Sequence, residues 1–191
     1  MIFRKHFELK NKHAFLSPSN HSWMNYSPQK LRDVFLANLA KEQGTRMHDL
    51  AKSLIELGVK LPKSKKTFNL YVNDAIGFRM TPEVPLFYSD NCFGTADSIT
   101  FDEKEKFLRI HDLKTGKTQA SMNQLIAYAA LFCLEYGYKP SELRMELRIY
   151  QMDEVSVYVP EPNEIADVID KIKSFDDIIR KMKDEAGVNA L

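Results

Sequence analysis

Residues 94–128 read GTADSITFDEKEKFLRIHDLKTGKTQASMNQLIAY, and this stretch decides the fold that the sequence predicts. Residues 93–101 and 107–114 have the composition of strands and are joined by a short charged connection, which indicates an antiparallel hairpin. The mostly apolar residues 119–136 that follow predict a helix ended by Gly137. A hairpin followed by a buried helix favours an α/β domain.

Helical and strand patterns extend outward from this stretch on both sides. Ser27-Pro28 predicts a helix start, and Gly44-Thr45 predicts the start of a second helix that Gly58 ends. Downstream, residues 143–149 and 155–159 predict two strands, and the apolar spacing of residues 165–182 predicts an amphipathic helix. This order predicts an α/β fold with a central mixed β-sheet flanked by helices.

Composition limits the class of protein. A chain of 191 residues with 44% hydrophobic content suits one domain, residues 1–191, with a sizeable core. The longest apolar run, residues 125–134, is too short for a membrane span of about 20 residues, and the amino terminus does not resemble a secretion signal. Cys92 and Cys133 lack the spacing of a zinc site or a disulfide framework. We therefore expect a soluble cytoplasmic protein, with no membrane partner.

Two carboxylates in the opening stretch suggest a metal site. Hydrolysis of a phosphodiester needs a cation, a positioned water and help in deprotonating that water. Asp97 and Asp112, on adjacent strands, are suitable side-chain ligands for Mg²⁺, and the Leu113 carbonyl adds another oxygen. His48 could complete the set, and an imidazole ligand suits Mn²⁺ better than Mg²⁺.

Three further polar residues fit the same chemistry. Lys114 shares a strand face with Asp112, so it could orient the attacking water or remove a proton from it. Gln124 and Tyr128 stand four apart on one helix face, where both could bind phosphate or base. Each of these residues alone also has an ordinary structural interpretation, in packing, in a turn or on a helix surface. The metal-site hypothesis depends on their combination and order.

The order of these motifs resembles a known family. Gly44-Thr45-Arg46-Met47-His48, Gly94-Thr95-Ala96-Asp97, Asp112-Leu113-Lys114 and Gln124 to Tyr128 resemble the ordered motifs of the RecB-like branch of the PD-(D/E)xK nucleases. The resemblance covers about residues 15–130 and includes the opening Leu16-Ser17-Pro18-Ser19. It implies a restriction-endonuclease-like core, which the strands and helix of residues 142–186 would complete.

The resemblance also implies roles for individual residues. His48, Asp97, Asp112 and the Leu113 carbonyl would bind Mg²⁺ or Mn²⁺. Asp97, Asp112 and Lys114 would be catalytic, and Gln124 and Tyr128 would contact single- or double-stranded DNA. Glu83 fits either an additional carboxylate ligand or a loop residue, and it is left out of the predicted site.

The sequence differs from some members of this family in two features. Some relatives hold an iron–sulfur cluster through a cysteine that precedes a proline, whereas Ser27-Pro28 stands here, so we expect no cluster. The sequence contains no recognisable helicase or other partner domain. In this respect it resembles the small stand-alone exonucleases of phages and mobile elements. A role in DNA recombination, repair or degradation, in the cytoplasm of a bacterial or phage-infected cell, would follow. A homo-oligomer or a recombination partner protein is compatible with it.

The leading hypothesis is thus a divalent-metal-dependent DNA exonuclease, and three alternatives stay open. The same site would serve a structure-specific or nicking endonuclease. The fold could also be a DNA-binding module without turnover. Finally, His48-Asp49 and His111-Asp112 could be ligands of a histidine-aspartate phosphohydrolase. This last possibility is disfavoured, because His111 alternates to the strand face opposite Asp112.

Overall fold

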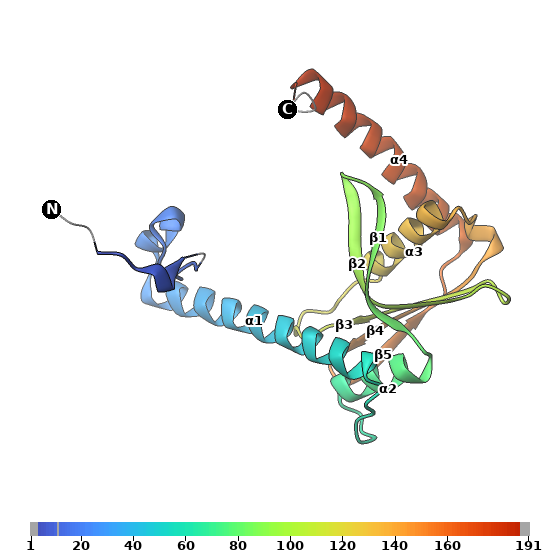
Figure 1. Ribbon diagram of the computed structural model, residues 1–191, viewed down its shortest axis with the longest axis horizontal. Coiled ribbons are helices and arrows are strands. Elements are labelled where there is room, and N and C mark those ends of the chain that lie inside the picture. Colours follow the sequence, from blue (N-terminus) through green and yellow to red (C-terminus); the bar gives the residue numbers. More distant parts are fainter. Residues whose placement is uncertain (1–3, 11, 188–191) are drawn as a thin grey trace. The chain divides into compact units, whose positions relative to one another are not determined.

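The computed structural model describes residues 4–10 and 12–187, and the chain falls into two compact units, residues 1–45 and 46–191 (Figure 1). The N-terminal unit contains two 3₁₀ helices, Phe7–Leu9 and Pro18–Asn25, and the first part of α1 (Pro28–Glu56). Trp23 Nε1 donates a hydrogen bond to the Ser17 carbonyl at 2.9 Å. None of the residues whose burial is described up to position 45 is buried, so this unit has little apolar core of its own.

The second unit is built on one five-stranded sheet with the order β1-β2-β3-β4-β5. The strands are β1 (Thr81–Ser89), β2 (Cys92–Asp102), β3 (Phe107–Leu113), β4 (Arg144–Gln151) and β5 (Glu154–Tyr158). Neighbouring strands are antiparallel except β3 and β4, which are parallel. The parallel pair is connected through α3 (Asn123–Tyr136), since parallel strands need a crossover connection.

Helices cover both faces of this sheet. On one face, α3 and the start of α4 (Pro162–Glu185) pack in a cluster that includes Leu108 and Ile110 of β3. On the other, α2 (Thr67–Gly77) and the end of α1 form a second cluster with Leu113. Because alternate strand residues point to opposite faces, β3 is buried on both sides. The predicted α/β class, a mixed sheet flanked by helices, is thereby confirmed.

Helix ends follow the local signals in the sequence. Ser27 Oγ accepts a hydrogen bond from the Lys30 N–H at 3.2 Å, so it caps α1 as predicted. Gly58, at φ +65°, and Gly137, at φ +74°, follow α1 and α3 in the left-handed conformation that favours glycine. Both predicted helix stops are therefore confirmed.

Two sequence-based expectations about elements were wrong, and two elements were missed. Gly44-Thr45 does not start a second helix: α1 continues through it, and the Thr45 hydroxyl bonds to the Lys41 carbonyl one turn back at 3.2 Å. The helix expected from residue 119 begins at Asn123, because the Ala120 N–H is bound by the Gln151 side chain. No element was expected over residues 67–89, where the structure has α2 and β1.

No described helix combines the length and the hydropathy that crossing a lipid bilayer requires.

Candidate functional site

Three carboxylates occupy successive positions across β1, β2 and β3. The register pairs Pro82 with Ser98 and Val84 with Ala96, which puts Glu83 across from Asp97. Ser98 pairs with His111, and the next step of this register puts Asp97 across from Asp112. The Leu113 N–H donates to Asp97 Oδ2 at 2.8 Å, which fits this register. The sheet therefore assembles an acidic row from residues far apart in sequence.

His48 reaches this row from α1. It lies on the same helical face as the buried Ala51 and Ile55, spaced three and seven residues from it. Its Nδ1 lies 3.4 Å from Asp97 Oδ2, an ion pair when the imidazole is protonated. Burial of the end of α1 against the sheet thus brings an imidazole to the carboxylates.

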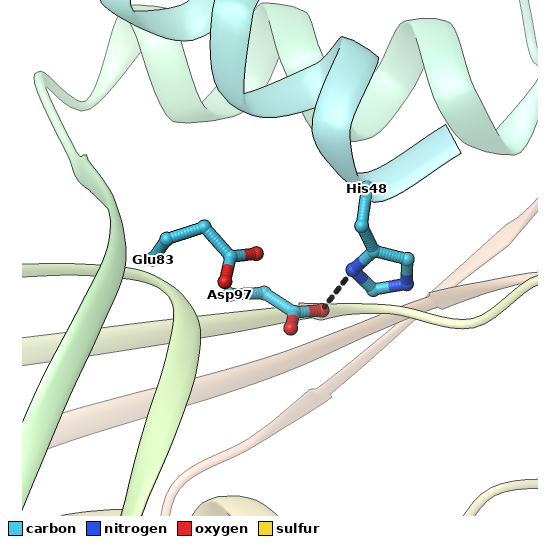
Figure 2. Close-up of side chains that lie close together, drawn as sticks. All are labelled: His48, Glu83 and Asp97. Atoms are coloured by element: carbon cyan, nitrogen blue, oxygen red, sulfur yellow. Dashed lines mark ion pairs between the residues drawn. The ribbon is translucent and has the colours of Figure 1, made fainter. Parts of the chain in front are cut away.

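His48, Glu83 and Asp97 form a group that could hold a metal ion (Figure 2). One ligand atom from each lies within 4.8 Å of the others. In Figure 2 the Glu83 carboxylate and the His48 ring both point toward Asp97. The structure brings two predicted ligands together and adds a third, Glu83, that the predicted site had left out.

Asp112 is the most buried member of the acidic row, with 2% of its side chain exposed. Lys114 Nζ lies 3.1 Å from its Oδ1 in an ion pair. Neither carboxylate oxygen accepts a hydrogen bond of good geometry from the described part of the chain. A buried carboxylate without hydrogen-bond donors is costly unless a cation offsets its charge, which fits a metal ligand beside Asp97.

A chain of contacts leads from Asp112 to α3. Lys114 Nζ donates to Gln124 Oε1 at 2.7 Å, and Gln124 Nε2 donates to the Tyr128 hydroxyl at 3.2 Å. The Tyr128 ring lies against the backbone of Gly94, where a Cβ atom would approach Cε1 to 3.0 Å. The structure therefore links four residues of the predicted site in series: Asp112, Lys114, Gln124 and Tyr128.

Burial and the charge of Asp97 raise the pKa values of two carboxylates of the row. Burial, and then the charge of Asp97, raises the pKa of Asp112 to about 6. The same two causes raise the pKa of Glu83, and the interaction with Asp97 raises the pKa of His48. A bound cation would act in the opposite direction, favouring the ionised carboxylates and the neutral imidazole. The site is thus electrostatically suited to a cation.

The donor set fits a hard divalent ion. Carboxylate oxygens suit Mg²⁺ and Mn²⁺, and the His48 imidazole favours Mn²⁺ between the two. Leu113 contributes its N–H to Asp97, while the predicted role of its carbonyl as a ligand stays a prediction. The expected absence of an iron–sulfur cluster also stays a prediction.

His111 bears on the phosphohydrolase alternative. It is fully buried on the α2 face, where its ring contacts Phe78 and Tyr150, and its Nδ1 lies 3.2 Å from the Tyr150 hydroxyl. Asp112 points to the opposite face of β3. His111 and Asp112 therefore do not converge on one metal, as that alternative requires.

No protein family, no curated protein and no solved structure matches this chain. The geometry of the residues therefore carries the functional argument.

Proposed function

We propose that this protein is a divalent-metal-dependent nuclease that hydrolyses phosphodiester bonds of DNA and degrades it from an end. The observation that carries the proposal is the acidic row of Glu83, Asp97 and Asp112, with His48 beside Asp97 and Lys114 beside Asp112. A PD-(D/E)xK-type core of the RecB-like branch is part of the same proposal, and the contacts that link His48 to Asp97 and Asp112 through Lys114 and Gln124 to Tyr128 support it.

The acidic row with His48 would hold the metal. A divalent cation there would supply a Lewis acid that offsets the negative charge developing on the phosphate. Without a cation, three carboxylates would repel a phosphate group, so the site requires a metal to admit its substrate. Metal dependence is accordingly a central expectation.

Lys114 would act on the reacting phosphate or on the attacking water. Asp112 and Gln124 hold its ammonium group from two sides, at 3.1 and 2.7 Å, which restricts its position. A restrained cation costs little reorganisation when charge develops in the transition state. Lys114 is thus positioned to orient the water or to stabilise that charge.

Gln124 and Tyr128 would contact the DNA strand. They present an amide and a hydroxyl on one face of α3, next to Lys114. Such groups bind phosphate oxygens without reading sequence. We therefore expect cleavage with little dependence on base sequence.

The test is a cleavage assay on end-labelled linear DNA and on covalently closed circles, with Mg²⁺, Mn²⁺ or a chelator. Wild-type protein should degrade linear DNA only with metal and leave circles intact. Asp97→Asn and Lys114→Gln should each lose at least about 100-fold in rate, equal to about 2.7 kcal/mol of transition-state stabilisation.

A matched pair of variants serves as the control. Glu105 and Arg144 form an exposed ion pair at 3.0 Å in another part of the sheet unit. Glu105→Gln and Arg144→Gln should therefore keep wild-type activity. Wild-type protein inert on single- and double-stranded DNA with either metal would overturn the proposal, and cleaved circles would replace the exonuclease with an endonuclease.

A further inference from the structure

The two units of the chain carry opposite net charge. Residues 1–45 contain seven lysines and arginines against three acidic residues, a net charge of +4, whereas residues 46–191 contain 20 against 23, a net charge of −3. The overall charge of +1 conceals this asymmetry. A basic segment on an otherwise acidic chain indicates a partner with dense negative charge.

The cations of the N-terminal unit are free to bind such a partner. None of its lysines and arginines at the described positions 4–10 and 12–45 pairs with a carboxylate, and all are exposed: Arg4, Lys5, Lys10, Lys12, Lys30, Arg32 and Lys41. In the sheet unit, by contrast, Arg109, Arg148 and Lys114 are all held by carboxylates. The exposed cations at these positions of the N-terminal unit are therefore not neutralised by carboxylates, whereas these three side chains of the sheet unit are.

Aromatic rings are interleaved with these cations. Phe7 is 77% exposed, and Trp23 and Tyr26 are only partly buried. Proteins that bind single strands combine a cationic surface with aromatic rings on which bases stack, at about 1–3 kcal/mol for each base. Bases in a duplex are already stacked on one another, so these rings favour an unpaired strand.

We propose that the N-terminal unit binds single-stranded nucleic acid, through its exposed cations, the exposed Phe7 ring and the half-buried Trp23 and Tyr26 rings. The unit has little core of its own, so binding would supply contacts that its residues lack within the chain. This inference deepens the proposed function, because it names the part of the chain that would hold the nuclease substrate outside the metal site. It concerns binding alone.

Trp23 makes the test direct, because it is the only tryptophan in the protein. Its fluorescence reports on the N-terminal unit without any label. Full-length protein is titrated with an oligothymidylate of about 16 nucleotides, the upper range of a single binding module, in the presence of chelator so that no cleavage occurs. We expect a saturable change in Trp23 fluorescence, and a weaker response to a duplex of the same length.

Two charge-matched variants locate the binding surface. One replaces Lys10, Lys12, Lys30 and Arg32 with Gln, and the control replaces four exposed lysines of the sheet unit, Lys104, Lys171, Lys173 and Lys181. Each phosphate contact on a single strand adds about 0.7 to the slope of log K against log salt. The first variant should therefore lose roughly 3 from this slope and bind at least about tenfold more weakly. The control should bind as wild type does.

Several results would overturn this assignment. Trp23 fluorescence that stays constant while a labelled oligonucleotide binds would place the contact elsewhere. Equal losses in the two variants would show a general charge effect, and equal affinity for duplex would remove the stacking argument. Unchanged binding by the first variant would mean that the cations serve another acidic partner, such as a protein surface.

The binding test and the cleavage test can fail separately. Asp97→Asn should still bind the oligothymidylate in chelator, since the metal site is not needed for this contact. Binding without any metal-dependent cleavage would keep the N-terminal surface and reject the nuclease. Metal-dependent cleavage without a Trp23 response would keep the nuclease and reject the N-terminal binding surface.

Discussion

Glu83 is both a candidate ligand and a residue with an unfavourable backbone conformation. Its φ of +51° lies in the left-handed region, which costs a residue with a side chain on the order of 1 kcal/mol. Its neighbours in β1 are Pro82 and Val84, which pair regularly with β2. The pairing of its neighbours with β2 therefore holds Glu83 in the left-handed conformation, at the position whose carboxylate joins His48 and Asp97.

Two substitutions separate the carboxylate of Glu83 from its backbone. Glu83→Gln removes the charge and keeps the strain, whereas Glu83→Gly removes both. Both variants should bind Mn²⁺ at least about tenfold more weakly, measured by calorimetry. In urea unfolding with chelator, the Gly variant should be more stable than the Gln variant by about 1 kcal/mol. Wild-type Mn²⁺ affinity in the Gly variant would contradict the role of Glu83 as a ligand.

His111 and Asp112 are adjacent buried groups whose effects on stability oppose each other. Burial, and then the charges of Arg148 and Arg109, lowers the pKa of His111 from 6.5 to about 2. The contribution of His111 to the free energy of unfolding is therefore fully present above pH 6.5 and is lost as the pH falls toward 2. Burial and the charge of Asp97 raise the pKa of Asp112 from 3.8 to about 6. The contribution of Asp112 to the free energy of unfolding is therefore fully present below pH 3.8 and is lost as the pH rises through 6.

Between pH 4 and 6 these two slopes should nearly cancel, since each amounts to about 1.4 kcal/mol for each pH unit. We predict that His111→Gln exposes the Asp112 slope, with stability rising as the pH falls from 6 to 4. Asp112→Asn should expose the opposite slope. Urea unfolding with chelator over this range measures both, and each variant is the control for the other. Slopes of the same sign would contradict the opposed roles.

At the scale of elements, the connection between β3 and α3 is organised by one side chain. Gln151, nearly buried in β4, donates from Nε2 to the carbonyls of Gly116 and Thr118 at 2.7 and 2.8 Å. Its Oε1 accepts from the Ala120 N–H at 2.9 Å. This loop joins the strand of Lys114 to the helix of Gln124, so Gln151 positions both.

We predict that Gln151→Leu lowers kcat of the proposed cleavage about tenfold and leaves Mn²⁺ affinity unchanged. The reason is that the variant releases the loop without touching a metal ligand, and a misplaced Lys114 weakens the transition state only. Gln119→Leu is the matched control, because Gln119 is exposed in the same loop and should tolerate the change. A parallel loss of Mn²⁺ affinity in Gln151→Leu would show a general structural defect instead.

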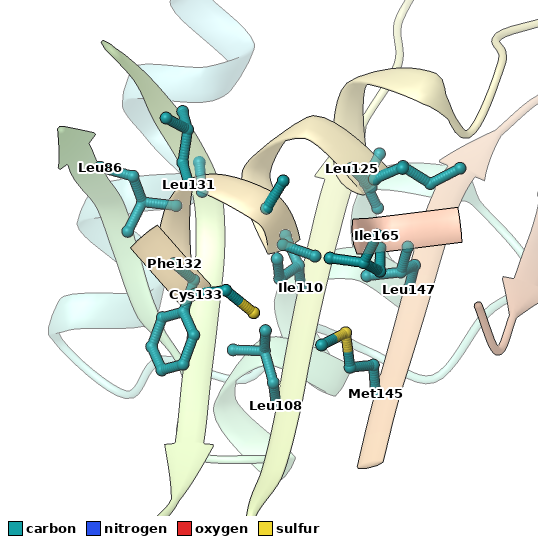
Figure 3. Close-up of a cluster of buried hydrophobic side chains, with 14 of the residues drawn as sticks. Leu86, Leu108, Ile110, Leu125, Leu131, Phe132, Cys133, Met145, Leu147 and Ile165 are labelled. Carbon is teal, nitrogen blue, oxygen red and sulfur yellow. The ribbon is translucent and has the colours of Figure 1, made fainter. Parts of the chain in front are cut away.

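The elements that the sequence predicted best are those with a strong local pattern. The apolar run of α3 and the alternation in β3 and β4 predicted their burial, and in Figure 3 Leu125, Phe132 and Cys133 of α3 pack beside Leu108 and Leu147 of the sheet. The strand β1 was missed because Pro82 and Pro85 suggested a loop. Both prolines are tolerated because β1 is an edge strand, where one side of the strand has no partner in the sheet.

At the scale of the whole molecule, the acidic row depends on strand register. The pairing of Asp97 with Asp112 comes from a short hairpin that the sequence predicts. Glu83 joins only when β1 pairs with β2, and His48 joins only when the end of α1 packs on the sheet. No local pattern around Pro82-Glu83 distinguishes a ligand from a loop residue, so the sequence alone had no means of selecting Glu83.

The two units should also respond differently to metal. Metal that binds only the folded state stabilises it by RT ln(1 + [L]/Kd), about 2.7 kcal/mol at 100 times Kd. The candidate ligands His48, Glu83 and Asp97 all belong to the sheet unit. Trp23 belongs to the N-terminal unit, which has no described buried residue to share in a cooperative core. Metal should therefore stabilise the core without changing the signal of Trp23.

We predict that urea unfolding followed by far-UV circular dichroism shifts to higher urea with Mn²⁺, while the transition of Trp23 fluorescence stays where it is in chelator. The sheet unit supplies all five strands, α2 to α4 and the end of α1, so it dominates the dichroism. Non-coincident transitions are the sign that two probes report on separate units. Asp97→Asn should abolish the Mn²⁺ shift in dichroism and leave the Trp23 transition unchanged. If both signals instead move together with Mn²⁺ in the wild type, the N-terminal unit unfolds with the sheet, and its low burial does not measure its stability.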